Sequence, residues 1–198
     1  MLSRKNFYIS SKIFFTLISL IMLIPLTFLT IFFDFSSLRL LNREIASANR
    51  NALFLYQEQL EADLSQIETS MAQDWAQNWN YQKLKYKLDP LDVHLNTLSI
   101  VNKAREQLAL TECLGAVYIY SAPNDVCRCA YQDCYSYKEL ITMQNYVKSL
   151  DFESTPKSWF YDKVGDKYFL VRLIGFSNAY SVSLVDFDLV MAPSRLAT

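Results

Sequence analysis

Residues 13–33 read IFFTLISLIMLIPLTFLTIFF, which includes Pro25 but no charged residue. An apolar run of about 20 residues is long enough to cross the hydrocarbon core of a bilayer as a helix. The following stretch, 34–80, contains neither Gly nor Pro, so no residue in it favours a helix break. The sequence therefore predicts a transmembrane helix over 13–33 that continues as a long membrane-proximal helix over 34–80.

A cleaved signal peptide is the alternative interpretation of this run. The run is too long for that, and no small-x-small cleavage site follows it closely, since the nearest is Ala46-Ser47-Ala48. Basic residues lie on both sides of it: Arg4, Lys5 and Lys12 before, and Arg39, Arg43 and Arg50 after. The positive-inside rule thus gives only a preference: a cytoplasmic tail over 1–12, and a single-pass anchor in the cell membrane with the domain outside the cytoplasm.

The membrane-proximal helix carries two apolar patterns. Spacings of four and three residues alternate along Leu41, Ile45, Ala48, Ala52 and Leu55. This seam is typical of helix–helix contacts, and it predicts a homodimer through the membrane-proximal helix. After Tyr56 the pattern shifts by one residue and approaches a 3.6-residue period, along Leu60, Leu64, Ile67, Met71, Trp75 and Trp79. That stripe predicts packing against a globular domain.

The chain has 198 residues, and those beyond the span suffice for one domain. They carry 16 basic and 20 acidic residues, a net charge of −4, and no basic patch indicates a nucleic-acid partner. Helices are expected over 89–110, with Asp89 as N-cap, and from a Ser136-x-x-Glu139 capping box to about Leu150. The first of these is expected to bury Leu91, Leu95, Leu98, Val101 and Leu108.

Five strands are expected in the same region. Two hairpins are predicted, 115–121 with 126–131 and 158–164 with 167–175, followed by a last strand over 180–187. Tight turns between neighbouring strands imply an antiparallel sheet, with helices packed on one side of it. The fold class is therefore α+β, with the long helix packed on a five-stranded antiparallel sheet.

The order of these elements, with the stretches SWFYDKVGDKYFLVRLIG (158–175) and AYSVSLVDFDLV (179–190), resembles the extracytoplasmic Cache (PAS-like) sensor region of bacterial membrane receptors, especially YesM-type sensor histidine kinases. The resemblance implies a single Cache domain over 81–190 and a stub over 191–198 before a second span. It also implies the sensing half of a two-component signal-transduction receptor without its kinase, because the only histidine is His94.

A ligand site is expected on one face of the sheet. If Ser121 pairs with Val126, and Val164 with Lys167, each hairpin separates an aromatic face from an aliphatic one. The aromatic faces carry Tyr118, Tyr120, Tyr131, Trp159, Tyr161 and Arg172. Aromatic walls with one cation suit a small molecule bearing a carboxylate or several hydroxyls, while the aliphatic face is expected to pack on the long helix. The alternative is that Trp159 and Arg172 form a cross-strand cation–π pair on a solvated face.

The same register places Cys113 opposite Cys134, so a cross-strand disulfide is expected. Cys127 and Cys129 are then free, or one of them pairs with Cys134 instead. A zinc site is the rival interpretation, but the spacing lacks the paired Cys-x2-4-Cys knuckles of structural zinc sites. No metal or other cofactor is expected.

No residue pattern points to an enzyme. His94 has no nucleophile or acid at useful spacing, and Asp186 with Asp188 is expected to cap or to be solvated at the end of a strand. Phosphate loops, nucleophile elbows and HExxH motifs are not found. The predicted function is ligand sensing. The alternative is a membrane-anchored structural or scaffold protein of an envelope complex, although not a pilin, because the first Gly is Gly115 and the first Glu is Glu44.

Overall fold

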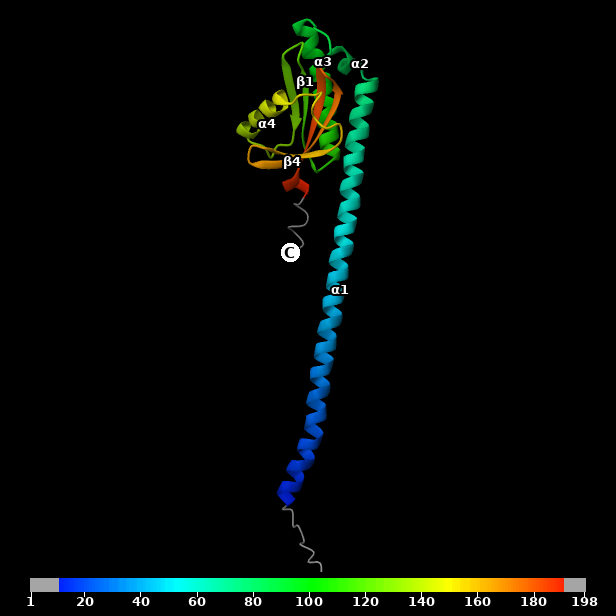
Figure 1. Ribbon diagram of the computed structural model, residues 1–198, viewed down its shortest axis with the longest axis vertical. Helices are drawn as coiled ribbons and strands as arrows, with labels where there is room; N and C mark the ends of the chain where they lie inside the picture. Colours follow the sequence, from blue (N-terminus) through cyan, green and yellow to red (C-terminus); the bar gives the residue numbers. More distant parts are fainter. Residues whose placement is uncertain (1–10, 191–198) are drawn as a thin grey trace, which may run out of the picture. The chain divides into compact units, whose positions relative to one another are not determined.

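The computed structural model describes residues 11–190 (Figure 1). The chain forms two compact units, Met1–Gln57 and Glu58–Thr198, and the boundary falls inside helix α1, Ser11–Gln77. The last turns of α1 therefore belong to the same unit as the domain predicted over 81–190. Residues 1–10 of the predicted tail and the whole predicted stub, 191–198, lie outside the described residues.

In the first unit, every side chain of α1 from Ile13 to Leu55 is exposed. Among the described residues this is the one helix that is long and apolar enough to cross a membrane. The hydroxyl groups of Thr27 and Thr30 donate to carbonyl oxygens one turn earlier, at 3.0 Å to Leu23 and 2.6 Å to Leu26. They are thereby satisfied without water, as a bilayer interior requires. This part of α1 is compatible with a single membrane pass.

The long helix ends three residues before the predicted position 80. Asn78 leaves the helical conformation, with φ −87° and ψ 114°, and its side chain caps the short helix α2, Trp79–Lys83, by accepting from the Asn80 amide at 3.0 Å. The predicted stripe is confirmed at Ile67, Met71 and Trp75, which are buried, but it stops there because Trp79 is 68% exposed.

Helix α3, Pro90–Leu110, begins as predicted, with the Asp89 carboxylate accepting from the Leu91 amide. Its predicted core face was only half right. Val101 and Leu108 are buried, but Leu91, Leu95 and Leu98 are exposed by 64, 54 and 45%. The face of α3 that is buried instead carries Asn96, Thr97, Ile100, Val101, Ala104 and Leu108.

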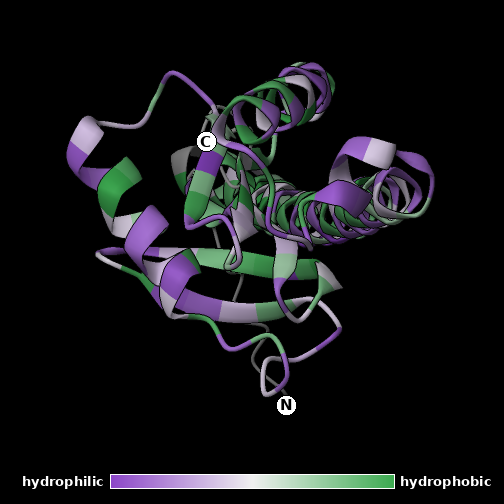
Figure 2. Cartoon of the chain, turned by 90° about the horizontal axis from the view of Figure 1, so that it is seen from above, coloured by the Kyte–Doolittle hydropathy of each residue, from purple (hydrophilic) through white to green (hydrophobic). Residues whose placement is uncertain are grey.

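The strands are β1 (Leu114–Ser121), β2 (Val126–Tyr131), β3 (Phe160–Val164), β4 (Lys167–Phe176) and β5 (Ala179–Asp186). They form one antiparallel sheet in the order β2-β1-β5-β4-β3, which confirms the α+β class. Both hairpins have the predicted register, with Ser121 opposite Val126 and Val164 opposite Lys167. The central strand β5 is buried at every position, and Figure 2 shows green, hydrophobic stretches in the strands of the sheet.

Helices cover both faces of the sheet rather than one. On one face lie α3 and the last turns of α1, and Ile67, Met71, Trp75, Val117 and Ile119 belong to the core there. On the other face lies α4, Tyr137–Ser149, over a second core (Figure 1). The predicted capping box that starts α4 is present, with reciprocal bonds between Ser136 and Glu139.

Candidate functional site

The six residues predicted to form one ligand site lie on two opposite faces of the sheet. Ser183 of β5 is paired with Val117 on one side and Arg172 on the other. Arg172 therefore shares the α1 face with Val117 and not with Tyr118. Each hairpin separates its faces as predicted, but the aromatic face of the first hairpin and that of the second point in opposite directions. The single six-residue site was wrong.

The tyrosines of the first hairpin lie on the α4 face. The Tyr118 hydroxyl is buried against α4 and donates to the Leu140 carbonyl oxygen at 3.0 Å. Tyr120 packs on Tyr180 with ring centroids 5.1 Å apart, whereas Tyr131 is exposed on the edge strand β2. Tyr118 and Tyr120 are thus parts of a packed core.

Arg172 and Trp159 lie on the α1 face. The Arg172 guanidinium donates to Glu68 of α1 at 2.7 Å, to the Leu173 carbonyl at 3.1 Å and also to the Lys157 carbonyl. No cation–π contact between Arg172 and Trp159 occurs in residues 11–190. The third predicted member, Tyr161, is exposed and stacks on Tyr168 with centroids 5.1 Å apart.

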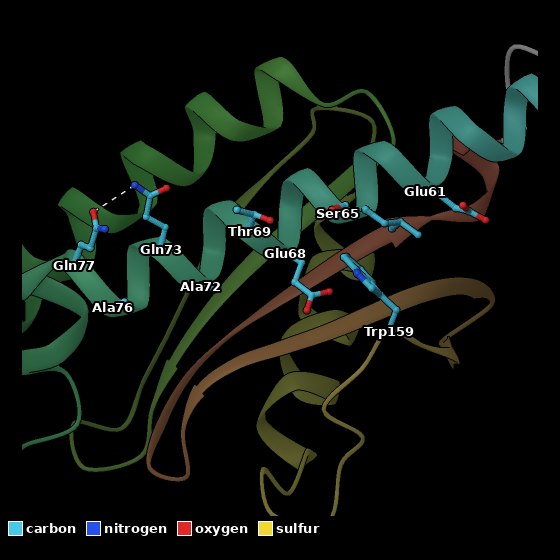
Figure 3. A pocket seen from close by; sticks show the side chains of 10 residues that line it. Glu61, Ser65, Glu68, Thr69, Ala72, Gln73, Ala76, Gln77 and Trp159 are labelled. Atoms are coloured by element: carbon cyan, nitrogen blue, oxygen red, sulfur yellow. Dashed lines mark hydrogen bonds between the residues drawn. The ribbon is translucent and has the colours of Figure 1, made fainter.

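A groove of about 900 Å³ runs along α1 with Trp159 as its opposite wall (Figure 3). The helix contributes carboxylates, hydroxyl groups, amides and small side chains. These residues are Glu61, Leu64, Ser65, Glu68, Thr69, Ala72, Gln73, Ala76 and Gln77. The groove was not predicted, because its helical positions, apart from Leu64, lie outside the apolar stripe of α1.

Two buried donors beside this groove have no hydrogen-bond partner within the described part of the chain. They are Trp159 Nε1 and Arg172 Nε. An unpaired buried N–H group costs about 1–3 kcal/mol, so each donor would gain from an acceptor oxygen. Both nitrogens are buried, and Arg172 itself does not line the groove but pairs with Glu68, which does.

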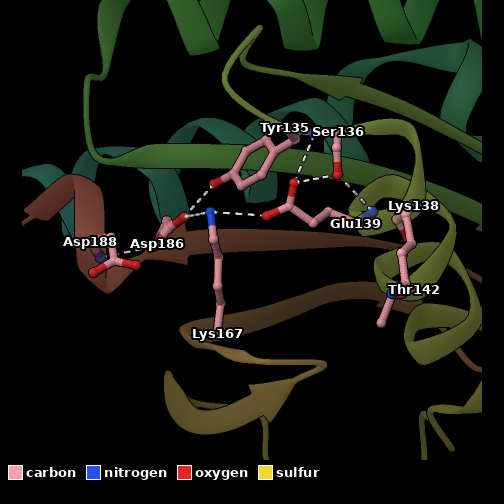
Figure 4. A network of polar contacts seen from close by, with 8 residues as sticks. All are labelled: Tyr135, Ser136, Lys138, Glu139, Thr142, Lys167, Asp186 and Asp188. Carbon is pink, nitrogen blue, oxygen red and sulfur yellow. Dashed lines mark hydrogen bonds and ion pairs between the residues drawn. The ribbon is translucent and has the colours of Figure 1, made fainter.

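A polar network lies on the α4 face of the sheet, at the C-terminal end of β5 (Figure 4). Tyr135 donates to Asp186 at 2.8 Å, and Lys167 contacts both Asp186 at 3.6 Å and Glu139 at 3.2 Å. Partial burial alone would lower the pKa of Lys167, but its bond to Glu139 and the charge of Asp186 raise it above the ordinary value. Hydrogen bonds from the Ser136 hydroxyl and amide lower the pKa of Glu139 to about 2.

The sequence led us to expect that Asp186 caps or is solvated, and solvation is wrong, because the residue is only 1% exposed. Its capping role is confirmed, since it accepts from the Asp188 amide at 2.8 Å. The network fixes the end of the central strand to α4 and to the β3–β4 hairpin. A small hollow of about 150 Å³ beside it is lined by Lys138, Glu139, Thr142 and the Gly165–Lys167 turn, too small for an organic ligand of ordinary size.

The predicted bridge between Cys113 and Cys134 is absent, and all four cysteines are free thiols. The β1–β2 ladder ends at the pair Ala116 with Tyr131, so the chain leaves the ladder before Cys134. Cys113 belongs to the core on the α1 face, with its sulfur 3.9 Å from Asp63, and burial raises its pKa to about 11. Cys134 is exposed, near Lys167 on the other face.

Searches of protein-family models, of curated protein sequences and of solved structures found no match for this chain.

Proposed function

We propose that this chain is a membrane-anchored, Cache-like (PAS-like) ligand-sensing domain of a signal-transduction receptor, with the groove between α1 and Trp159 as its ligand site. The observation that carries the proposal is that one helix, α1, contains the candidate span and also forms part of the sheet domain's core. Whatever changes the packing of α1 on the sheet acts on the helix that would enter the membrane.

The contacts between α1 and the central strand support this proposal. Trp75 Nε1 donates to the Ser181 hydroxyl at 3.0 Å, and the Ser183 hydroxyl lies 2.7 Å from the Met71 sulfur. Both serines are fully buried in β5. The central strand and the helix are in direct side-chain contact, so a shift of one changes the packing of the other.

The lining of the groove favours a neutral ligand with several hydroxyl groups. Trp159 offers an aromatic face, and the helix offers hydroxyl, amide and carboxylate groups, a combination that suits a sugar or another polyol. Of the two ligand classes expected from the sequence, the carboxylate is disfavoured, because Arg172 already pairs with Glu68 and Glu61 adds a second negative charge.

The proposed mechanism is a shift between two packings of α1 on the sheet. A ligand in the groove touches the helix and Trp159 at once, so it favours the packing in which both contacts form. It can move the equilibrium only by its difference in affinity for the two packings. In the proposed receptor the sheet domain lies outside the cytoplasm, and the seam from Leu41 to Leu55 pairs two copies of the chain.

The test is a thermal-melting screen of the full chain in detergent micelles or nanodiscs. The panel contains monosaccharides and linear polyols, with dicarboxylates as the contrasting class. A ligand at 100 times its dissociation constant stabilises the folded state by about 2.7 kcal/mol, which raises the melting temperature by several degrees.

Trp159→Phe supplies the site-specific control, because it keeps an aromatic wall and removes the unpaired indole N–H. The matched variant is Trp79→Phe, which alters an exposed indole elsewhere. The expected result is a shift produced by a polyol, reduced in Trp159→Phe and retained in Trp79→Phe. A panel without effect, or a shift that survives in Trp159→Phe, contradicts the proposed site.

A further inference from the structure

A hollow of about 150 Å³ lies between helix α3 and the edge strand β2. Each element contributes an arginine to its lining, Arg105 from α3 and Arg128 from β2. The rest of the lining includes His94, Thr97 and the apolar Leu98. Among the described residues no Asp or Glu lines this hollow, so the charge that it presents is positive.

Arg128 occupies a position where an apolar side chain would be expected. It is paired with Ile119 across the β1–β2 ladder, and Ile119 is fully buried in the core of the α1 face. Because directly paired residues lie on the same face of a sheet, Arg128 lies on the face that α3 covers, although it remains exposed. An inward charge on an edge strand can prevent pairing with other chains, and this protective role is the alternative to a ligand site.

Neither arginine is neutralised by the part of the chain that the structure describes. The ion pairs found in residues 11–190 involve other basic residues. A guanidinium group has five N–H donors, and Arg105 makes one long hydrogen bond, of 3.4 Å, to the Asn102 side chain. Two like charges that line one small hollow repel each other, and an anion between them would remove that cost.

We propose that this hollow binds a phosphate group, or another tetrahedral oxyanion with two negative charges. Two guanidinium groups balance a dianion, whereas a single carboxylate neutralises only one of them, and the paired N–H groups of arginine match the oxygens of a phosphate. The His94 ring offers a further N–H donor in either protonation state, while the Thr97 hydroxyl already donates to the Val93 carbonyl at 2.7 Å. A volume of about 150 Å³ admits one such group and no organic ligand of ordinary size.

A bound dianion joins α3 to the edge of the sheet. It contacts a guanidinium group of the helix and one of the strand, so it binds the folded domain and stabilises it. The hollow is lined by α3 and β2, whereas the other groove is lined by α1 and Trp159. The two sites share no residue, so this inference does not rest on the proposed sensing function.

Thermal melting of the full chain in micelles of a non-ionic detergent without sugar groups tests the proposal. Sodium phosphate is titrated against sodium chloride and sodium acetate at equal ionic strength, which controls for salt screening and for single carboxylates. Arg105→Gln and Arg128→Gln each remove one cation of the hollow. Arg50→Gln is the matched control, because it removes the same charge from an exposed position of the first unit.

A second arm identifies the source of the group, because free phosphate and the headgroup of phosphatidic acid present the same chemistry. The chain is compared in phosphatidylcholine nanodiscs with and without phosphatidic acid, in the absence of free phosphate. A rise in melting temperature that phosphatidic acid produces in the wild type and not in Arg128→Gln assigns a lipid headgroup. Equal melting in the two nanodiscs, together with a response to phosphate in micelles, assigns the free ion.

The expected result in micelles is a rise in melting temperature with phosphate, with an apparent dissociation constant on the order of 1 mM. Each variant of the hollow should weaken this affinity about tenfold or more, since it loses a charge-assisted contact, while Arg50→Gln and Trp159→Phe keep the wild-type value. Phosphate also stabilises proteins without binding to a site, and that effect would persist in the variants. A phosphate shift that survives in both Arg105→Gln and Arg128→Gln therefore overturns the proposal, as does equal melting in phosphate, chloride and acetate.

Discussion

The two faces of the sheet are fixed to their helices in different ways. On the α4 face, the Tyr118 hydroxyl donates to the Leu140 carbonyl, and the Tyr180 hydroxyl lies 3.0 Å from the carbonyl oxygens of Val147 and Leu150. On the α1 face, the links join side chain to side chain, as in Trp75 with Ser181 and Arg172 with Glu68. The α4 face has such links too, in Lys167 with Glu139 and Tyr146 with Asp162, but it has them in addition to its bonds to the helix backbone.

This difference separates a fixed layer from one that is open to adjustment. A tyrosine bonded to the carbonyl oxygens of a helix fixes that helix by its backbone, and its aromatic ring fills the core. An ion pair at the edge of a groove involves longer side chains and depends on solvent and salt. We therefore expect α4 to move with the sheet, and the position of α1 to respond to changes in the groove.

The strongest test of this comparison is Trp75→Ala. Trp75 is buried against Tyr81, with centroids 4.7 Å apart, and it holds α1 to β5. Removing a buried aromatic ring costs about 3–5 kcal/mol, and urea unfolding of the full chain in micelles should show this loss. Trp79→Ala, at an exposed indole, should stay within about 0.5 kcal/mol of wild type. Equal losses in the two variants would mean that α1 is not part of the core.

Gly115→Ala tests the α4 face. A Cβ at Gly115 would clash with the Tyr135 hydroxyl and lie 3.2 Å from the Leu184 carbonyl, so the ring must move and its bond to Asp186 is lost. We expect a loss of about 1–3 kcal/mol in the free energy of unfolding. Adding Tyr135→Phe removes the clashing oxygen, so the double variant should lose less than the sum of the single losses. Simple additivity would show that the close approach does not matter.

Local signals in the sequence were sufficient for most of the fold. Asp89, the Ser136–Glu139 capping box and the turn at Gly165 each act within a few residues, and the structure has the elements that they predict. The register of a hairpin is equally local, because the turn fixes which residues face each other. Elements and hairpins could therefore be predicted one by one.

The candidate site could not be predicted in the same way, because it depends on pairings that no turn fixes. The two hairpins are related only through β5, whose register places Arg172 in a row with Ser183 and Val117. A slip of one residue in either pairing would exchange the faces. The contact between Arg172 and Glu68 spans 104 residues, and nothing in the sequence around either residue indicates it.

The pH dependence of the capping box tests how α4 is anchored at its start. The folded-state pKa of Glu139 is lowered to about 2 from an ordinary 4.5, so its ionised form stabilises the fold above pH 4.5. That stabilisation is lost as the pH falls toward 2. Near pH 6, Glu139→Gln should cost about 1 kcal/mol, and the difference from wild type should shrink across this interval in urea titrations. A difference that stays constant with pH would assign the effect to packing.

The smallest expected effect belongs to Glu68→Gln, and it tests the adjustable face most directly. The Arg172 side chain is only 12% exposed and that of Glu68 is 40% exposed, so solvent screens the charge of Glu68 more than that of Arg172. Its loss should cost about 0.5–1 kcal/mol in the free energy of unfolding, less in 1 M salt than in 0.1 M. Glu58→Gln is the matched control, because Glu58 is an exposed residue of α1 and the first residue of the second unit.

If the polyol response changes in Glu68→Gln while stability hardly does, then the ion pair sets the position of α1 and contributes little to the stability of the domain. If Glu68→Gln destabilises the chain as much as Gly115→Ala does, the two faces are equally fixed, and the groove has no adjustable helix beside it.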